Sequence, residues 1–153
     1  MNIEITDQKP QIAVAIKKEN ATMAEIAVLA TEGLQKVFAF LAQQGTNIIG
    51  APYLAYSNGN ADFTKFDVEL GIPVSAEIAV SGEFFMSKNC DGKAITAIHK
   101  GPYKDVEAAY VALMGYMAEN KLESTGVYYD YYLNNPANTP ESELLTQVVF
   151  PIK

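Results

Sequence analysis

The residues with the clearest capacity for chemistry lie in one aromatic stretch, GVYYDYYLNNP, at positions 126–136. If this stretch is a β-strand, alternation places Tyr128, Asp130 and Tyr132 on one face and the other tyrosines on the opposite face. A buried carboxylate is costly unless it is paired, tyrosine hydroxyls can donate hydrogen bonds to it, and ring faces attract cations. The pattern favours a pocket with Asp130 as the counter-charge of a bound cation, and an exposed strand face with Asp130 in water is the alternative.

Other chemically capable residues are few and scattered. Glu69 lies on an expected strand, KFDVELGIP, and is a candidate second pocket acid, although a solvated face is the favoured alternative. His99 is the only histidine and Cys90 the only cysteine, and their spacing is not that of metal ligands. We therefore predict no metal and no cofactor. The chain shows no glycine-rich phosphate loop, nucleophile elbow or Ser/His/Asp set, so we assign no catalytic residue.

Composition limits the partners that we expect. The formal charge is −7, and all eleven basic residues are lysines. Without a basic, arginine-bearing face, direct binding of nucleic acid is not expected, whereas an acidic field attracts cations. The N-terminus lacks the pattern of a signal peptide, and no apolar run is long enough to span a bilayer. A single cysteine fits a reducing compartment, so we expect a cytoplasmic protein without membrane contact.

The elements that position these residues are repeated along the chain. Residues 12–17 and 94–99 are strand-like, and each is followed by a helical pattern, a glycine, an aromatic strand ending in Asn, and a final strand ending at a proline. The first helix begins with a capping box formed by Thr22 and Glu25, and the second is expected just after Pro102. We predict an α+β fold: a tandem βαββ repeat with a pseudo-two-fold axis, one curved, largely antiparallel sheet and two long helices.

The repeat pairs residues of the two halves, which we place at about 1–75 and 76–153 of a single domain. Leu54 and Tyr56 are the counterparts of Asp130 and Tyr132. If the two-fold axis holds, Tyr56 faces the same cleft from the other side and Leu54 gives that wall an apolar surface. The open alternative is that Tyr56 is an ordinary core residue. Methionines on the second helix, Met114 among them, could give a pocket adaptable walls.

The second half carries an ordered set of motifs over about sixty residues. This set resembles the GyrI-like domain family, also called the AraC-type or bacterial transcription-activator effector-binding domain. The first half is similar to the family in layout. The residues that carry the resemblance are His99, Gly101, Pro102, Tyr103, the acid two residues before Tyr132, Leu133, Asn134, Pro136, Pro151 and Ile152.

The resemblance implies two strand–helix–strand–strand halves with a cleft between the helices, where hydrophobic and often cationic small molecules bind. It also implies a structural role for His99, at the end of a strand. Family members typically have Glu at the position of Asp130, so the carboxylate here is one methylene shorter and lies nearer the strand. The ligand-binding residues that we predict are Asp130, Tyr132, Tyr128, Tyr56, Tyr103, Leu54, Glu69 and Met114.

Three functions stay open at this point. The favoured one is a free-standing effector-binding module that senses or sequesters cationic, amphipathic drugs, with a separate DNA-binding partner if it regulates transcription. The second is an enzyme, since the resemblance includes hydrolases of strained, cyclopropane-bearing compounds, with Asp130 and Tyr132 or Tyr103 in acid–base roles. The third is a protein-interaction module of the gyrase-inhibitor type. Binding is preferred to catalysis, and a homodimer stays open.

Overall fold

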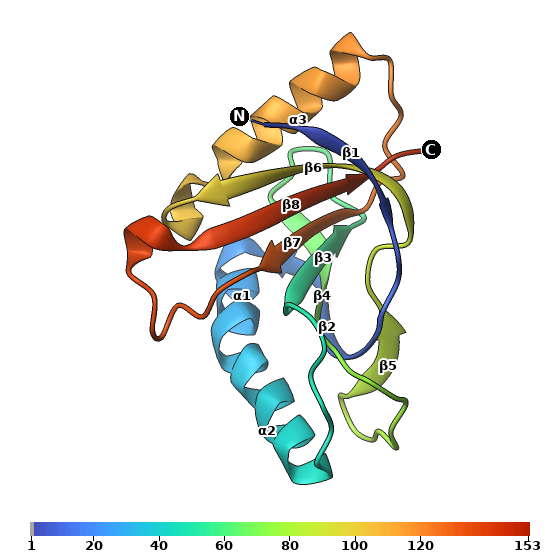
Figure 1. The fold of residues 1–153 in the computed structure, drawn as a ribbon, viewed down its shortest axis with the longest axis vertical. Helices are drawn as coiled ribbons and strands as arrows, with labels where there is room; N and C mark the ends of the chain where they lie inside the picture. Colours follow the sequence, from blue (N-terminus) through green and yellow to red (C-terminus); the bar gives the residue numbers. More distant parts are fainter. Residues whose placement is uncertain (1) are drawn as a thin grey trace. The chain divides into compact units, whose positions relative to one another are not determined.

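The computed structural model describes residues 2–153, which form two compact units (Figure 1). The first-repeat unit comprises Pro10–Asn89. The second-repeat unit comprises residues 2–9 together with Cys90–Lys153. Each unit contains one βαββ repeat and one additional strand, and all strand pairs within each unit are antiparallel. The predicted α+β class and the tandem βαββ order are confirmed.

The first-repeat unit has a four-stranded sheet with the strand order β3-β4-β2-β5 and a long helical segment. The capping box predicted at the start of this segment is present, because Thr22 accepts from the Glu25 N–H while the Glu25 carboxylate accepts from the Thr22 N–H. The helical segment is divided by a π-helical turn. In chain order the elements are β2 (Ile12–Thr22), α1 (Met23–Val28), the π-turn η1 (Leu29–Gly33), α2 (Leu34–Gln44), β3 (Tyr53–Ser57), β4 (Lys65–Pro73) and β5 (Phe85–Lys88).

The second-repeat unit has the strand order β1-β6-β8-β7. Its helix α3 lies along one face of β6 and β8 and buries Ala109, Leu113 and Met117 against that face. The helix that we expected directly after Pro102 begins as a 3-10 turn, and the α-helix proper starts at Glu107. The elements are β1 (Glu4–Gln8), β6 (Gly92–Lys100), η2 (Tyr103–Asp105), α3 (Glu107–Glu119), β7 (Tyr128–Tyr132), η3 (Glu141–Glu143) and β8 (Leu145–Pro151).

The boundary between the units differs from the predicted division near residue 75. The strand β5 pairs with β2 of the first repeat, although it leads directly into β6. The strand β1 pairs with β6 of the second repeat, although it leads directly into β2. Each repeat is thus completed at its edge by the strand that precedes the other repeat. Because β1 and β5 pair in this way, the boundaries between the units fall at residues 9/10 and 89/90.

Strand register confirms the residue pairing predicted from the repeat. Leu54 lies opposite Leu70, three residues before Pro73. Asp130 lies opposite Val148, three residues before Pro151. The first strands agree as well, since Ala13 pairs with Pro73 and Ala94 with Pro151. Leu54 and Asp130 therefore occupy equivalent positions in the two repeats.

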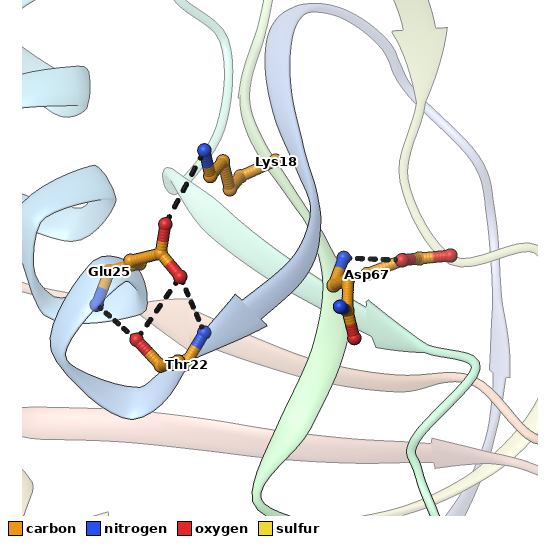
Figure 2. Close-up of polar contacts among 5 residues, drawn as sticks. Lys18, Thr22, Glu25 and Asp67 are labelled. Atoms are coloured by element: carbon orange, nitrogen blue, oxygen red, sulfur yellow. Dashed lines mark hydrogen bonds and ion pairs between the residues drawn. The ribbon is translucent and has the colours of Figure 1, made fainter.

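The strand β2 departs from this equivalence just before the helix. Its pairing with β4 shifts register between Lys18 and Ala21, and Asn20 there has a left-handed backbone with φ of 51°. The Asp67 carboxylate accepts the Asn20 N–H at 2.8 Å (Figure 2). The hydrogen bond from the Asn58 side chain and the one from the Asn20 N–H together lower the pKa of Asp67. The bulge is therefore pinned by an ionised acid.

Candidate functional site

Asp130 is a buried acid at the centre of β7. Its side chain is 4% exposed and accepts a hydrogen bond from the hydroxyl of Tyr110, which lies on α3. Asp130 therefore belongs to the sheet face that α3 covers. The tyrosine on the other face of β7, Tyr131, instead accepts a hydrogen bond from the Cys90 N–H at 3.0 Å. The predicted division of the aromatic strand into two faces is confirmed, and the acid lies on the helix side.

Tyr110 is a site residue that sequence reasoning did not assign. It shares the apolar stripe of α3 with Leu113 and Met117, and its ring stacks on Phe150 with the centroids 5.6 Å apart. Burial, followed by the charge of Asp130, raises the pKa of the Tyr110 phenol far above its usual range. Tyr110 is therefore a neutral hydrogen-bond donor. The available signal was that it is the one residue with a polar end on an otherwise apolar stripe.

The aromatic residues predicted on this face surround Asp130 along the strand. The ring of Tyr128 packs edge-on against Phe150 at 4.8 Å, on one side of Asp130. The ring of Tyr132 packs edge-on against Tyr103 at 5.2 Å, on the other side. Burial raises the pKa of Tyr103. Four tyrosines therefore lie on the side of the sheet that carries the acid. Tyr103, Tyr128 and Tyr132 were predicted as site residues, and Tyr110 is newly identified.

A second polar group on this face is Thr146 of β8. It lies directly opposite Tyr132 in the ladder and is 1% exposed. Its hydroxyl has no hydrogen-bond partner among the described residues. Buried polar groups without partners are rare in native proteins and are costly. Thr146 was not predicted, because a single threonine in a strand carries no distinguishing sequence signal.

His99 lies opposite Thr146 on β6, and its ring contacts the turn that follows this strand. Its Nε2 lies 3.0 Å from the carbonyl oxygen of Pro102. Because a carbonyl can only accept, Nε2 carries the proton and donates it. The histidine thus closes the turn that leads from β6 towards Tyr103, and so helps to position that ring.

Met114 is not packed into this cluster. It lies about one turn beyond Tyr110 on α3, and its side chain is 53% exposed. The cluster that the structure assembles in the second-repeat unit therefore consists of Asp130, Tyr110, Tyr128, Tyr132, Tyr103 and Thr146.

The predicted residues of the first-repeat unit lie on two different faces of its sheet. Leu54 is 1% exposed and belongs to the core, and Tyr56, on the same face, packs edge-on against Phe66 at 5.7 Å. Glu69 lies on the opposite face, where its carboxylate accepts hydrogen bonds from Tyr53 at 3.0 Å and Ser87 at 2.7 Å. The structure therefore brings Leu54 and Tyr56 together but separates both from Glu69.

The described residues hold no group of three or more His, Cys, Asp or Glu side chains that could bind a metal. Burial raises the pKa of the Cys90 thiol to about 11, so the sulfur is protonated near neutral pH. Within residues 2–153, no helix combines the length and the apolar character needed to cross a bilayer.

Comparison with known proteins defines the class of the molecule. Residues 1–153 match the GyrI-like small molecule binding domain. The chain belongs to the GyrI-like family, as its second-repeat motifs led us to expect. No curated protein matches the chain.

Solved structures show the same fold. The EcmrR C-terminal domain is 21% identical with a TM-score of 0.86, covering 99% of this chain and 97% of that one. In the EcmrR–DNA complex the match covers 99% of this chain but only 57% of EcmrR, with a TM-score of 0.85 and 21% identity. SAV2435 bound to tetraphenylphosphonium is 13% identical with a TM-score of 0.65, covering 100% and 99% of the two chains. At these identities the likeness shows the fold alone.

Proposed function

We propose that this protein binds hydrophobic organic cations, with the Asp130 carboxylate as counter-charge and tyrosine rings as walls. The observation that carries the proposal is a carboxylate 4% exposed, held by the phenol of Tyr110 and flanked by the rings of Tyr128 and Tyr132. A cation beside Asp130 would offset the cost of burying its charge. The family's small-molecule binding and the tetraphenylphosphonium bound to SAV2435 support this ligand class.

Each group of the cluster has a distinct role in this proposal. Tyr110 remains protonated and keeps the carboxylate in one orientation. The rings of Tyr128, Tyr132 and Tyr103 offer faces and edges to a flat or propeller-shaped cation, each contributing about 0.5–2 kcal/mol according to desolvation. The Thr146 hydroxyl would meet a polar substituent of the ligand. Tyr56 stays a predicted contact, to be tested by substitution.

Binding is favoured over hydrolysis by the chemistry of the acid's partner. A general acid works best when its pKa lies near the operating pH. The pKa of Tyr110 is raised by its surroundings, so its phenol holds the proton too tightly to transfer it readily. The Tyr103 ring packs on Tyr132, whereas the phenol donating to Asp130 is that of Tyr110.

We further infer that such binding serves drug sensing or sequestration in the cytoplasm. The sensing role is suggested by the likeness to EcmrR, which was solved on DNA. This chain's −7 charge and lack of arginine give it no basic face for phosphates. A regulatory role would therefore require a DNA-binding segment outside residues 1–153 or on another polypeptide. Electrophoretic mobility shift with and without tetraphenylphosphonium would test direct DNA binding, which we expect to be absent in both cases.

Isothermal titration with tetraphenylphosphonium tests the binding proposal. Asp130→Asn keeps an oxygen acceptor for the Tyr110 hydroxyl while removing the charge, so we expect roughly tenfold or greater weakening. Asp105→Asn, in the exposed turn η2, is the matched control and should bind like the wild type. The neutral triphenylphosphine oxide should bind both the wild type and Asp130→Asn with similar, weak affinity. Equal tetraphenylphosphonium affinity in the wild type and Asp130→Asn would refute the role of Asp130.

A further inference from the structure

A groove in the first-repeat unit is separate from the Asp130 cluster. It has a volume of about 410 Å³ and runs between β2 and the helical segment α1-η1-α2, with Glu83 at one side. This volume lies within the range of small-molecule sites, roughly 300–1,000 Å³. The residues that line it are Ile16, Lys17, Lys18, Ala24, Glu25, Val28, Leu29, Glu32, Gly33, Lys36 and Glu83.

The π-turn η1 shapes the apolar floor of this groove. Three of its five residues, Leu29, Glu32 and Gly33, line the groove, and the N–H of Leu34 bonds back to the carbonyl of Leu29. An added Cβ at Gly33 would lie 3.0 Å from methyl carbons of both Ile16 and Leu29. The glycine thus allows helix and strand to approach closely. Single π-turns inside helices occur frequently at functional sites, and α3 in the other repeat has none.

The charges around the groove are mostly compensated. Lys18 pairs with Glu25 at 3.4 Å (Figure 2), and Lys36 pairs with Glu83 at 3.7 Å, so that β2 and the turn before β5 are each tied to the helix. The Lys17 ammonium lies over the ring of Phe85 and pairs with Glu19. Among the described residues, Glu32 is the charged side chain of the groove that has no ion pair.

We propose that this groove is a second binding site for small amphipathic cations. The apolar body of the ligand would lie on Ile16 and Leu29, and its positive charge would face the carboxylate of Glu32. An anion is disfavoured, because the amines that could receive it are already held by glutamates or by an aromatic ring. The site shares its ligand class with the Asp130 cluster but no residue, so the two sites can succeed or fail separately.

Tetraphenylphosphonium titration followed by 1H–15N NMR tests the proposal at defined positions. In the wild type and in Asp130→Asn, we expect saturable shifts of the Leu29 and Gly33 amides. Glu32→Gln should weaken this saturation about two- to fivefold, as for an exposed charge pair. Ala24→Leu, at an exposed helix position that lines the groove, should abolish the shifts by filling it.

The control variant is Glu119→Gln, which removes the same charge from an exposed position at the end of α3. It should leave the Leu29 and Gly33 shifts unchanged, which separates a local carboxylate from the general acidity of the chain. The proposal is overturned if these amides do not shift at millimolar cation, or if they titrate equally in the wild type, Glu32→Gln and Ala24→Leu. A third outcome separates the two sites. If the Leu29 and Gly33 amides shift as expected, but Asp130→Asn binds tetraphenylphosphonium as the wild type does, only the Asp130 site is refuted.

Discussion

The two repeats carry side chains of opposite polarity at the same backbone position. At equivalent ladder positions, the first-repeat unit has Leu54 opposite Leu70 and the second-repeat unit has Asp130 opposite Val148. Both Leu54 and Asp130 are nearly inaccessible, at 1% and 4% exposure. A βαββ scaffold therefore tolerates either an aliphatic side chain or a carboxylate at this position, provided that the facing helix supplies a matching partner. Tyr110 is that partner on α3.

On the sheet face away from the helix, the acid is found in the first repeat and not in the second. In the first repeat, Glu69 on this face accepts from Tyr53 and Ser87, and the Tyr53 ring covers Gly71. In the second repeat, the residues equivalent to Glu69 and Gly71 are Gln147 and Val149. The acid thus lies away from the helix in one repeat and beneath it in the other. Polar function in this fold is decided by single side chains rather than by the repeat itself.

The largest expected effect comes from copying the acid into the first repeat. Leu54→Asp would place a carboxylate in an aliphatic environment beside Leu70, without an established tyrosine donor. Burying such a charge unpaired should lower the free energy of unfolding by about 3–5 kcal/mol. Urea unfolding monitored by circular dichroism measures the change.

The reciprocal substitution is the control for this comparison. Asp130→Leu removes the acid from the position where the protein has adapted to it, and leaves the Tyr110 hydroxyl without its acceptor. We expect a smaller change, within about 2 kcal/mol. A loss of stability from Asp130→Leu as large as that from Leu54→Asp would contradict the idea that the partner on the helix makes the difference.

A second difference between the ladders is the contact of Tyr53 with Gly71. A Cβ at Gly71 would lie 2.4 Å from the Tyr53 ring, a distance that requires the ring to move. Gly71→Ala should therefore reduce stability by about 1–3 kcal/mol through overpacking. Thermal unfolding of Gly71→Ala, Tyr53→Leu and the double variant measures the coupling. If the two single effects simply add, the close ring contact is not the cause.

Much of the repeat could be predicted because its signals are local. The prolines that end β4 and β8, and the aromatic strands that end in Asn, align Leu54 with Asp130 without any knowledge of packing. The capping box at Thr22 involves residues three positions apart. By contrast, the exchange of β1 and β5 between repeats depends on which sheet edge a short strand joins. That choice is made by contacts between residues far apart in the sequence, so no local sequence pattern predicts it.

The acid's partner could not be predicted for a related reason. Whether Tyr110 reaches Asp130 depends on the rotation of α3 about its axis, and the 3-10 turn at Tyr103–Asp105 sets the phase at which the α-helix begins. Periodicity identifies the apolar stripe but does not show which strand residue it meets. The same limit applies to Glu69, because its assignment to a pocket required knowing which face of β4 the helices cover.

Removing the two tyrosine hydroxyls compares the two acids directly. Tyr110→Phe takes from Asp130 its phenol donor in a buried setting, and we expect a loss of about 1–3 kcal/mol. Tyr53→Phe leaves Glu69 its hydrogen bond from Ser87, and the expected loss is about 1 kcal/mol or less. Chemical denaturation of both variants gives the ordering. A greater loss of stability from Tyr53→Phe than from Tyr110→Phe would contradict this ordering. It would show that the half-buried Glu69 depends more on its tyrosine donor than the buried Asp130 does.

The smallest effect concerns the bulge that distinguishes β2–β4 from the unbroken β6–β8 ladder. Hydrogen bonds from Asn58 and the Asn20 N–H lower the pKa of Asp67 in the folded state. A lowered folded pKa contributes stability above the unfolded value, about 3.9, and that contribution is lost as the pH falls through the folded pKa. The melting temperature of wild type should therefore exceed that of Asp67→Asn by more at pH 6 than at pH 3. Asn58→Ala removes the main donor, so its difference in melting temperature from the wild type should also be smaller at pH 3 than at pH 6. A difference in melting temperature that does not change with pH would exclude the ionisation of Asp67 as its cause.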